Sequence, residues 1–193
     1  MLDTALETLR AEIQDYLKNT SSLGINNETV ISLCNVMTQG NEINIKESLG
    51  LTLINIEEEK TLKSQVTYRK NTEGSVLNFN PEIKLNLYIL IAANFDNYET
   101  ALKYISCVLN FFQGKAVFDH TNTPSLDPSI EKLIAELYTM TFEQQNYLWA
   151  SVGAKMIPSL LYKIRMLVVQ ESVVTSVAPF VTKIITEEKS LTN

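Results

Sequence analysis

The amino-acid sequence predicts a single α+β domain, in which three to four helices pack on a mixed, mainly antiparallel sheet. The chain has 193 residues, a length typical of one domain. Strand-like segments come first, a strand and two helices follow, and strands return near the end. That order favours α+β over a regular alternation of strands and helices. The stretch 83–95 turns apolar on both faces, which is typical of a strand in the middle of a covered sheet.

Helix signals in the first half of the chain define two helices. Residues 1–19 repeat apolar side chains at helical spacing. Asp96 and Glu99 form a capping-box pattern, which predicts that a helix begins there with Asp96 as N-cap. This helix is expected to end near Phe112, because Gly114 follows. The buried face of this helix is predicted from its apolar stripe, which comprises Ala101, Leu102, Ile105, Val108, Leu109 and Phe112.

Two further helix starts are predicted in the second half. Asp127 before Pro128 combines a capping residue with the residue most favoured at the first helical position. Thr141 and Gln144 form another capping box, and the short helix they begin is expected to end near Gly153. The apolar positions that support the helix after Pro128 are Ile130, Leu133, Ile134, Leu137 and Tyr138.

Five to seven strands are expected from short runs of β-branched and alternating apolar residues. Pro158 tolerates only the start or edge of a strand. Residues 72–81 are interpreted as a loop. The predicted strands are 29–37, 48–56, 65–70, 83–95, 115–120, 159–169 and 173–185.

Charge and hydropathy disfavour two classes of partner. The net charge is −6 and the pI is about 4.9. Phosphate backbones require clustered Lys and Arg, and no such cluster occurs, so nucleic acid is not an expected partner. No segment approaches the ~20 apolar residues that span a bilayer, so membrane insertion is not expected. The N-terminal stretch MLDTALETLR lacks the basic and apolar regions of a secretory signal.

Catalytic and metal-binding patterns are scarce in the sequence. His120 is the single histidine, and the two cysteines, Cys34 and Cys107, lie far apart. One histidine with two scattered thiols is a weak basis for a zinc site. The phosphate-binding and nucleophile-elbow glycine motifs are missing from the sequence. We therefore expect no metal, no cofactor and no enzymatic activity.

Four blocks of sequence carry a family resemblance. They are LNLYILIAANF (85–95), YETALKYISCVLNFFQ (98–113), ELYTMTFEQQNYLWASVGAK (136–155) and IPSLLYKIRML (157–167). In this order and spacing they resemble the N-terminal-type domain of cap, or tail-terminator, proteins of phage-tail-like contractile injection systems. That family includes the caps of the antifeeding prophage and of the Photorhabdus virulence cassettes.

The resemblance implies a structural role. It implies a homo-hexameric ring that ends the inner tube and ties the last sheath layer to it, with the tube and sheath proteins as partners. The cap domain is expected over 1–170, and 171–193 is expected to add strands and a tail to the same domain. Assembly is expected in the bacterial cytoplasm, after which the chain is part of the particle, released or retained. The family brings no catalytic motif to this sequence.

Six residues are candidates for the contacts of a ring subunit. We expect Gln144, Gln145 and Asn146 to satisfy backbone groups of a neighbour or of the tube, and Trp149 to anchor the contact. Lys163 and Arg165 are expected to line the ring or to pair with acids of the next subunit. A second interpretation stays open for three of them. In that interpretation Trp149 fills the core, while Lys163 and Arg165 are ordinary solvent-facing strand residues.

Two other functions remain as alternatives. The first is an assembly adaptor or chaperone that binds a tail component or an effector without forming a ring. The second is an enzyme that uses Cys107 and His120 as a nucleophile pair, which requires an exposed thiol of low pKa. Oligomeric state separates the first alternative from a cap, and thiol reactivity tests the second.

Overall fold

The computed structural model describes residues 1–20, 29–38, 40, 42–59, 68–70, 76–78, 84–168 and 176–178. Three helices and nine strands occur in these residues. The helices are α1 (Leu2–Asn19), α2 (Tyr98–Gly114) and α3 (Phe142–Val152). The strands are β1 (Ile31–Leu33), β2 (Ser48–Glu58), β3 (Tyr68–Lys70), β4 (Val76–Asn78), β5 (Lys84–Asn94), β6 (Val117–Asp119), β7 (Ile130–Leu137), β8 (Ser159–Val168) and β9 (Ser176–Ala178).

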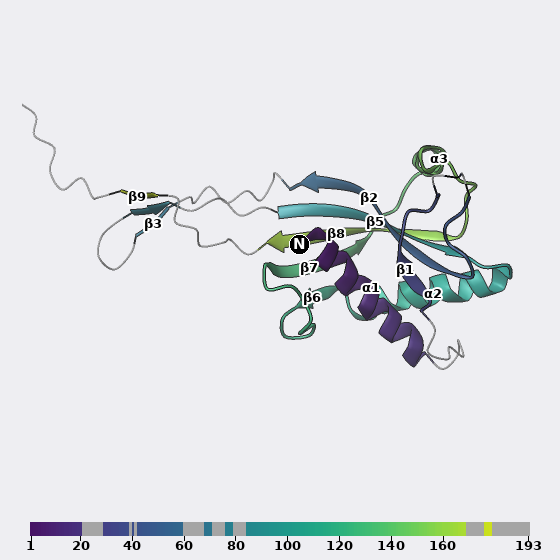
Figure 1. Cartoon of the computed structure of the whole chain (residues 1–193), viewed down its shortest axis with the longest axis horizontal. Helices are drawn as coiled ribbons and strands as arrows, with labels where there is room; N and C mark the ends of the chain where they lie inside the picture. Colours follow the sequence, from purple (N-terminus) through teal and green to yellow (C-terminus); the bar gives the residue numbers. More distant parts are fainter. Residues whose placement is uncertain are drawn as a thin grey trace, which may run out of the picture.

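Six strands form the main sheet, in the order β1-β2-β5-β8-β7-β6. The pair β1–β2 is parallel, and the other four neighbouring pairs are antiparallel. A second sheet has the order β3-β4-β9 and lies apart from the main sheet (Figure 1). The predicted α+β class with a mixed, mainly antiparallel sheet is therefore confirmed in outline.

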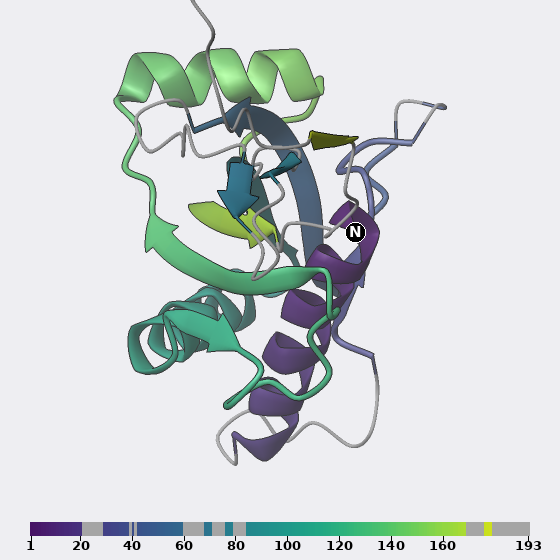
Figure 2. The ribbon, with the colours of Figure 1, turned by 90° about the vertical axis from the view of Figure 1, so that its left-hand side faces the viewer.

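Helices cover both faces of the main sheet. Figure 2 shows α3 on one side of the sheet and α1 with α2 on the other. Two apolar clusters correspond to these layers. The larger lies between the sheet and α1 with α2, and the smaller joins Trp149 of α3 to Leu90, Ala92 and Leu161 of the sheet. The sheet is thus buried on both faces where these helices lie over it.

β5 occupies the interior position that its sequence predicts. Leu87, Ile89 and Ile91 face the larger cluster, whereas Leu90 and Ala92 face the smaller one. All five side chains have no solvent exposure. A strand that is apolar on both faces needs cover on both faces, and this need explains why β5 lies between β2 and β8.

Gly50 in β2 lies where a side chain has no room. A Cβ atom at this position would be 2.6 Å from Cγ1 of Ile45 and 3.1 Å from Sγ of Cys34. Because Ile45 is itself buried, it has little space to move. We expect Gly50→Ala to lower the free energy of unfolding by about 1–3 kcal/mol, the usual cost of overpacking a core. Urea unfolding followed by circular dichroism measures this change.

A matched control uses the last residue of α2. No heavy atom lies within 4 Å of a Cβ built at Gly114. Gly114→Ala should therefore leave stability unchanged or raise it slightly, because alanine restricts the unfolded chain. An equal loss of stability in Gly50→Ala and Gly114→Ala would contradict the close approach at Gly50.

The helix predicted after Pro128 is wrong, because this segment forms strand β7. The pairing of β7 with β8 shifts register between Ile130 and Lys132. This bulge turns both Ile130 and Leu133 toward the core, three positions apart, and both are fully buried. A strand with a bulge therefore shows the apolar spacing of a helix, and the sequence pattern was misinterpreted for that reason.

Asp127 begins a turn in place of a helix. Its carboxylate accepts hydrogen bonds from the backbone N–H and the hydroxyl of Ser129 at 2.8 and 2.6 Å. It also accepts one from the hydroxyl of Thr4 in α1 at 2.8 Å. The hydrogen bonds from Ser129 and Thr4 lower the pKa of Asp127 to about 2. The same carboxylate thus forms the turn and ties it to α1.

α2 differs from its prediction in its cap and in its buried face. Asn97 is the N-cap in place of Asp96, and its side chain accepts from the backbone N–H of Glu99 at 2.8 Å. Leu102 and Leu109, predicted to be buried, are 42% and 39% exposed. The residues buried on α2 are Ala101, Tyr104, Val108, Phe111 and Phe112. Aromatic side chains bury more area than leucine, so they determine which face meets the sheet.

The strand predictions locate five of the six strands of the main sheet, all except β7, and they are incomplete outside that sheet. The segment 72–81, predicted as a loop, contains strand β4. The predicted strand 65–70 corresponds to β3 at the edge of the second sheet, with 65–67 outside the described residues. Within 173–185 only β9 is described, and the rest of that prediction lies outside the described residues. The strand at 29–37 is shorter than expected, because β1 has only three residues.

Candidate functional site

α3 begins and ends as its sequence predicts. The hydroxyl of Thr141 accepts from the backbone N–H of Gln144 at 3.2 Å, and the Gln144 side chain accepts from the backbone N–H of Thr141 at 3.0 Å. Gly153 ends the helix with a positive φ of 75°. The capping box is therefore confirmed, and it uses the side chain of Gln144 within the subunit.

A groove runs along α3 and the segment that follows it. It has a volume of about 360 Å³, and among its walls are Gln145, Asn146, Trp149 and Met156. Three of the sequence-predicted contact residues thus line one surface feature. The groove is bordered by a side chain that sequence reasoning missed, Phe142, which is 92% exposed.

Trp149 belongs both to this groove and to the core. Its side chain is 4% exposed and packs on Leu90, Ala92 and Leu161. Its indole N–H is buried and has no hydrogen-bond partner in the described part of the chain. Burial of an unpaired donor costs free energy, but the ring itself is packed among apolar side chains of the core. Trp149 therefore fills the core, and its role as a contact anchor stays a prediction.

Lys163 and Arg165 lie on the same face of the sheet as α3. They alternate along β8 with Tyr162, Ile164 and Met166, which point into the larger core cluster. Arg165 forms an ion pair with Glu136 of β7, and its Nε lies 3.3 Å from Oε2 of that carboxylate. Among the described residues, Lys163 has no ion-pair partner. Arg165 is thus engaged within the subunit, whereas Lys163 is the more available cation.

Side chains of β2 and β5 extend this polar surface. The Tyr88 hydroxyl donates to Glu57 at 2.9 Å, and Asn86 donates to Glu59 at 3.1 Å. Burial and the Glu57 carboxylate raise the pKa of Tyr88 to about 12. The ring of Tyr88 meets the ring of Tyr138 edge-on, with centroids 5.2 Å apart.

Sequence reasoning found the two cations of this polar face but missed the acids and amides beside them. Cross-strand register places Asn86 opposite Arg165 and Tyr88 opposite Lys163. Asn86 and Tyr88 alternate with Leu85, Leu87 and Ile89 in β5, and that alternation was the available signal. Their acidic partners, Glu57 in β2 and Glu59 just after it, are distant in sequence, so no local pattern marks them.

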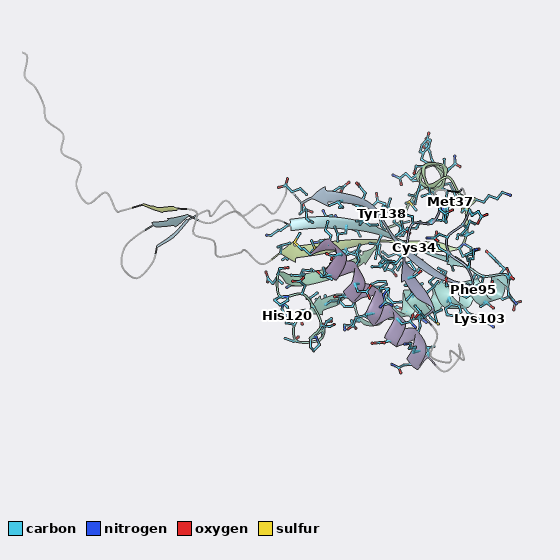
Figure 3. All side chains as sticks on the ribbon, in the orientation of Figure 1. Cys34, Met37, Phe95, Lys103, His120 and Tyr138 are labelled. Atoms are coloured by element: carbon cyan, nitrogen blue, oxygen red, sulfur yellow. The ribbon has the colours of Figure 1, made fainter. Side chains whose placement is uncertain are left out.

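The Cys107–His120 pair has no support in the structure. Burial raises the pKa of the Cys107 thiol, which disfavours the thiolate that a nucleophile needs. His120 is exposed in the turn that follows β6 (Figure 3). Within the described residues, no three Cys, His, Asp or Glu side chains are grouped to hold a metal ion. In the same residues, no helix has both the length and the apolar character needed to cross a bilayer.

Comparison with known protein families decides where this fold belongs. The sequence profile of the Pvc16 N-terminal domain matches residues 4–183. The chain belongs to the Pvc16 N-terminal domain family. A search of curated proteins gave no match to it.

Solved structures similar to this Pvc16 N-terminal domain chain are a terminator and a cap. One is the sheath/tube terminator of PVC, an extracellular contractile injection system, in its extended state. It is 15% identical with a TM-score of 0.60, and the match covers 100% of this chain and 64% of that protein. The other is the tube-terminating cap of the anti-feeding prophage. It is also 15% identical with a TM-score of 0.60, and the match covers 97% of this chain and 61% of the cap.

These matches confirm the predicted resemblance of this Pvc16 N-terminal domain chain to cap and terminator proteins. At 15% identity the structural likeness shows a shared fold. The chain spans less than two thirds of the length of either solved protein.

Proposed function

We propose that this chain is the structural cap of a contractile injection system. It ends the inner tube and holds the last sheath layer. The observation that carries the proposal is the family match over residues 4–183 together with the fold, which follows a terminator and a cap over nearly the whole chain. The cap domain comprises 1–170, and 171–193 adds to it. The partners are other copies of the chain, the inner tube protein and the sheath protein.

The surfaces of the subunit suit a role that depends on contacts. α3 presents an exposed phenylalanine beside a groove. The polar sheet face, formed by Asn86, Tyr88, Lys163 and Arg165, presents one ion pair and two uncharged donors. Closed rings arise from head-to-tail contacts between two different surfaces of one subunit. We propose that six copies close such a ring. Assembly takes place in the bacterial cytoplasm, and the ring then remains in the particle.

Removal of this chain from a producing strain tests the cap directly. We expect particles with tubes of irregular length, because nothing stops addition of tube subunits at the distal end. Electron micrographs of purified particles give the length distribution, and complementation with the wild-type gene is the control. Tubes of normal, uniform length in the deletion strain contradict the proposal.

Addition of purified chain to growing tubes in vitro tests the same function without the cell. A cap stops elongation at substoichiometric amounts and stays at one tube end. An adaptor or chaperone would bind tail components as a monomer and leave elongation unchanged, so that result would favour the alternative.

A further inference from the structure

Exposed residues of α2 and α3 carry few charges. Of the six exposed residues of α1, four are charged, which is ordinary for a solvated helix. Of the nine exposed residues of α2 only two are charged, and of the seven on α3 only one is. Loss of charged residues distinguishes the centre of a protein–protein interface from ordinary surface. The outer faces of α2 and α3 therefore have the composition of contact surfaces.

The α3 surface, formed by Phe142, Tyr147 and Met156, projects apolar side chains. Their exposed fractions are 92%, 64% and 65%. Single exposed apolar residues are common, but Phe142 and Met156 both line the groove, and large apolar side chains beside a groove are typical of a binding site. Phe142 is the first residue of α3 and lies between Thr141 and Gln144 of the capping box, so its backbone position is fixed by the helix start.

The α2 surface, formed by Leu102, Leu109 and Leu137, includes a hollow. Their exposed fractions are 42%, 39% and 51%. The hollow has a volume of about 320 Å³ and lies between α2 and the end of β7. It is lined by Leu109, Phe112, Gln113, Ala135, Leu137 and Tyr162. An apolar hollow of this kind fits a projecting aromatic side chain.

The two surfaces lie on opposite sides of the main sheet, and each has one acidic and one basic residue beside it. α3 lies on one side of the sheet and α2 on the other (Figures 1 and 2). Exposed Glu143 and Lys155 adjoin the α3 surface, and exposed Glu99 and Lys103 adjoin the α2 surface. Each surface thus presents one carboxylate and one ammonium group, so both can be paired across a contact between them.

We propose that the α3 surface of one copy packs against the α2 surface of the next copy, with Phe142 entering the hollow between α2 and β7. The inference rests on the proposed ring and identifies the two surfaces that close it. Because the surfaces differ and face opposite ways, the contact repeats from copy to copy in one direction. The polar sheet face, with Lys163, stays outside this contact.

Two double variants test the contact in the full-length chain. The α3 variant is Phe142→Glu with Tyr147→Lys, which adds an acid to the first helical turn and a lysine four residues after Glu143. The α2 variant is Leu102→Lys with Leu109→Lys. All four positions are exposed, so both proteins should stay folded. An α1 variant, Asp15→Lys with Lys18→Glu, is the matched control on an exposed helix face.

Native mass spectrometry and analytical ultracentrifugation measure the assembly. We expect wild type and the α1 variant to form the ring, and each of the other two variants to remain monomeric alone. Loss of one aromatic anchor should raise the concentration for half-assembly at least ~30-fold. An equimolar mixture of the α2 and α3 variants retains one intact contact per pair, so it should give dimers and nothing larger.

Several outcomes overturn the inference. The inference is wrong if the wild-type chain stays monomeric at all concentrations. It is also wrong if the α2 variant or the α3 variant still forms rings. A mixture that yields no dimer shows that the two surfaces do not meet each other. An α3 variant that forms rings but fails to stop tube growth places the tube end on the α3 surface instead. Tube capping is measured separately. If particles that lack the chain have tubes of irregular length, the proposed cap function stands even when these two surfaces do not contact each other.

Discussion

Trp149→Ala is expected to lower the free energy of unfolding by about 3–5 kcal/mol, the usual cost of removing a large aromatic side chain from a core. Trp149 is 4% exposed and is the buried residue by which α3 meets the sheet. It contributes to the smaller of the two core clusters, with Leu90 and Leu161 beneath it. Alanine leaves a cavity there, since the sheet cannot move to fill it. Chemical denaturation followed by near-UV circular dichroism measures the loss.

Trp149→Phe is the matched control. It keeps most of the apolar volume and removes the indole N–H, which has no partner in the described residues. We expect a change in stability below about 1.5 kcal/mol. If Trp149 is also a contact anchor through its N–H, this variant will weaken assembly while stability stays near wild type. A loss below about 1 kcal/mol for Trp149→Ala would show that α3 does not depend on this side chain.

Phe118→Ala is expected to cost about 3–5 kcal/mol as well. Phe118 is fully buried in β6, a strand of only three residues at the edge of the main sheet. Its ring centroid lies 6.0 Å from that of Phe111 and 6.3 Å from that of Phe112 in α2. The ammonium group of Lys115 lies 5.1 Å from the same ring. The variant loses an aromatic cluster and the side chain that holds the edge strand.

Thermal and urea unfolding of Phe118→Ala give its stability, and Val117→Ala is the neighbouring control. Val117 is 39% exposed on the same strand, so its truncation should change stability by less than about 1 kcal/mol. If the two substitutions cost the same, β6 is held by its backbone pairing with β7 and the aromatic cluster contributes little.

The sequence alone predicted those elements whose signals lie within a few residues. The capping box of Thr141 and Gln144, the end of α3 at Gly153 and the alternation of β8 are examples, and all are present. Each depends on contacts between residues at most four positions apart or on a period of two along one strand. The same applies to the family resemblance, because its blocks are continuous segments.

Prediction failed where a bulge or a competing apolar face changed a local pattern. β7 imitates helical spacing because its register shift turns Ile130 and Leu133 to the same side. α2 has apolar residues around much of its circumference, so periodicity could not tell that Leu102 and Leu109 would be exposed. In both cases the partner surface decides which residues are buried.

By itself the sequence determined the α+β class, the interior place of β5, the helix α3 and the absence of catalytic motifs. Only the tertiary structure decided which distant residues share a surface. Arg165 meets Glu136 across 29 positions of sequence, and Tyr88 meets Glu57 across 31. The physical reason is that side chains on neighbouring strands come together through sheet order and register, and these depend on burial of the whole sheet.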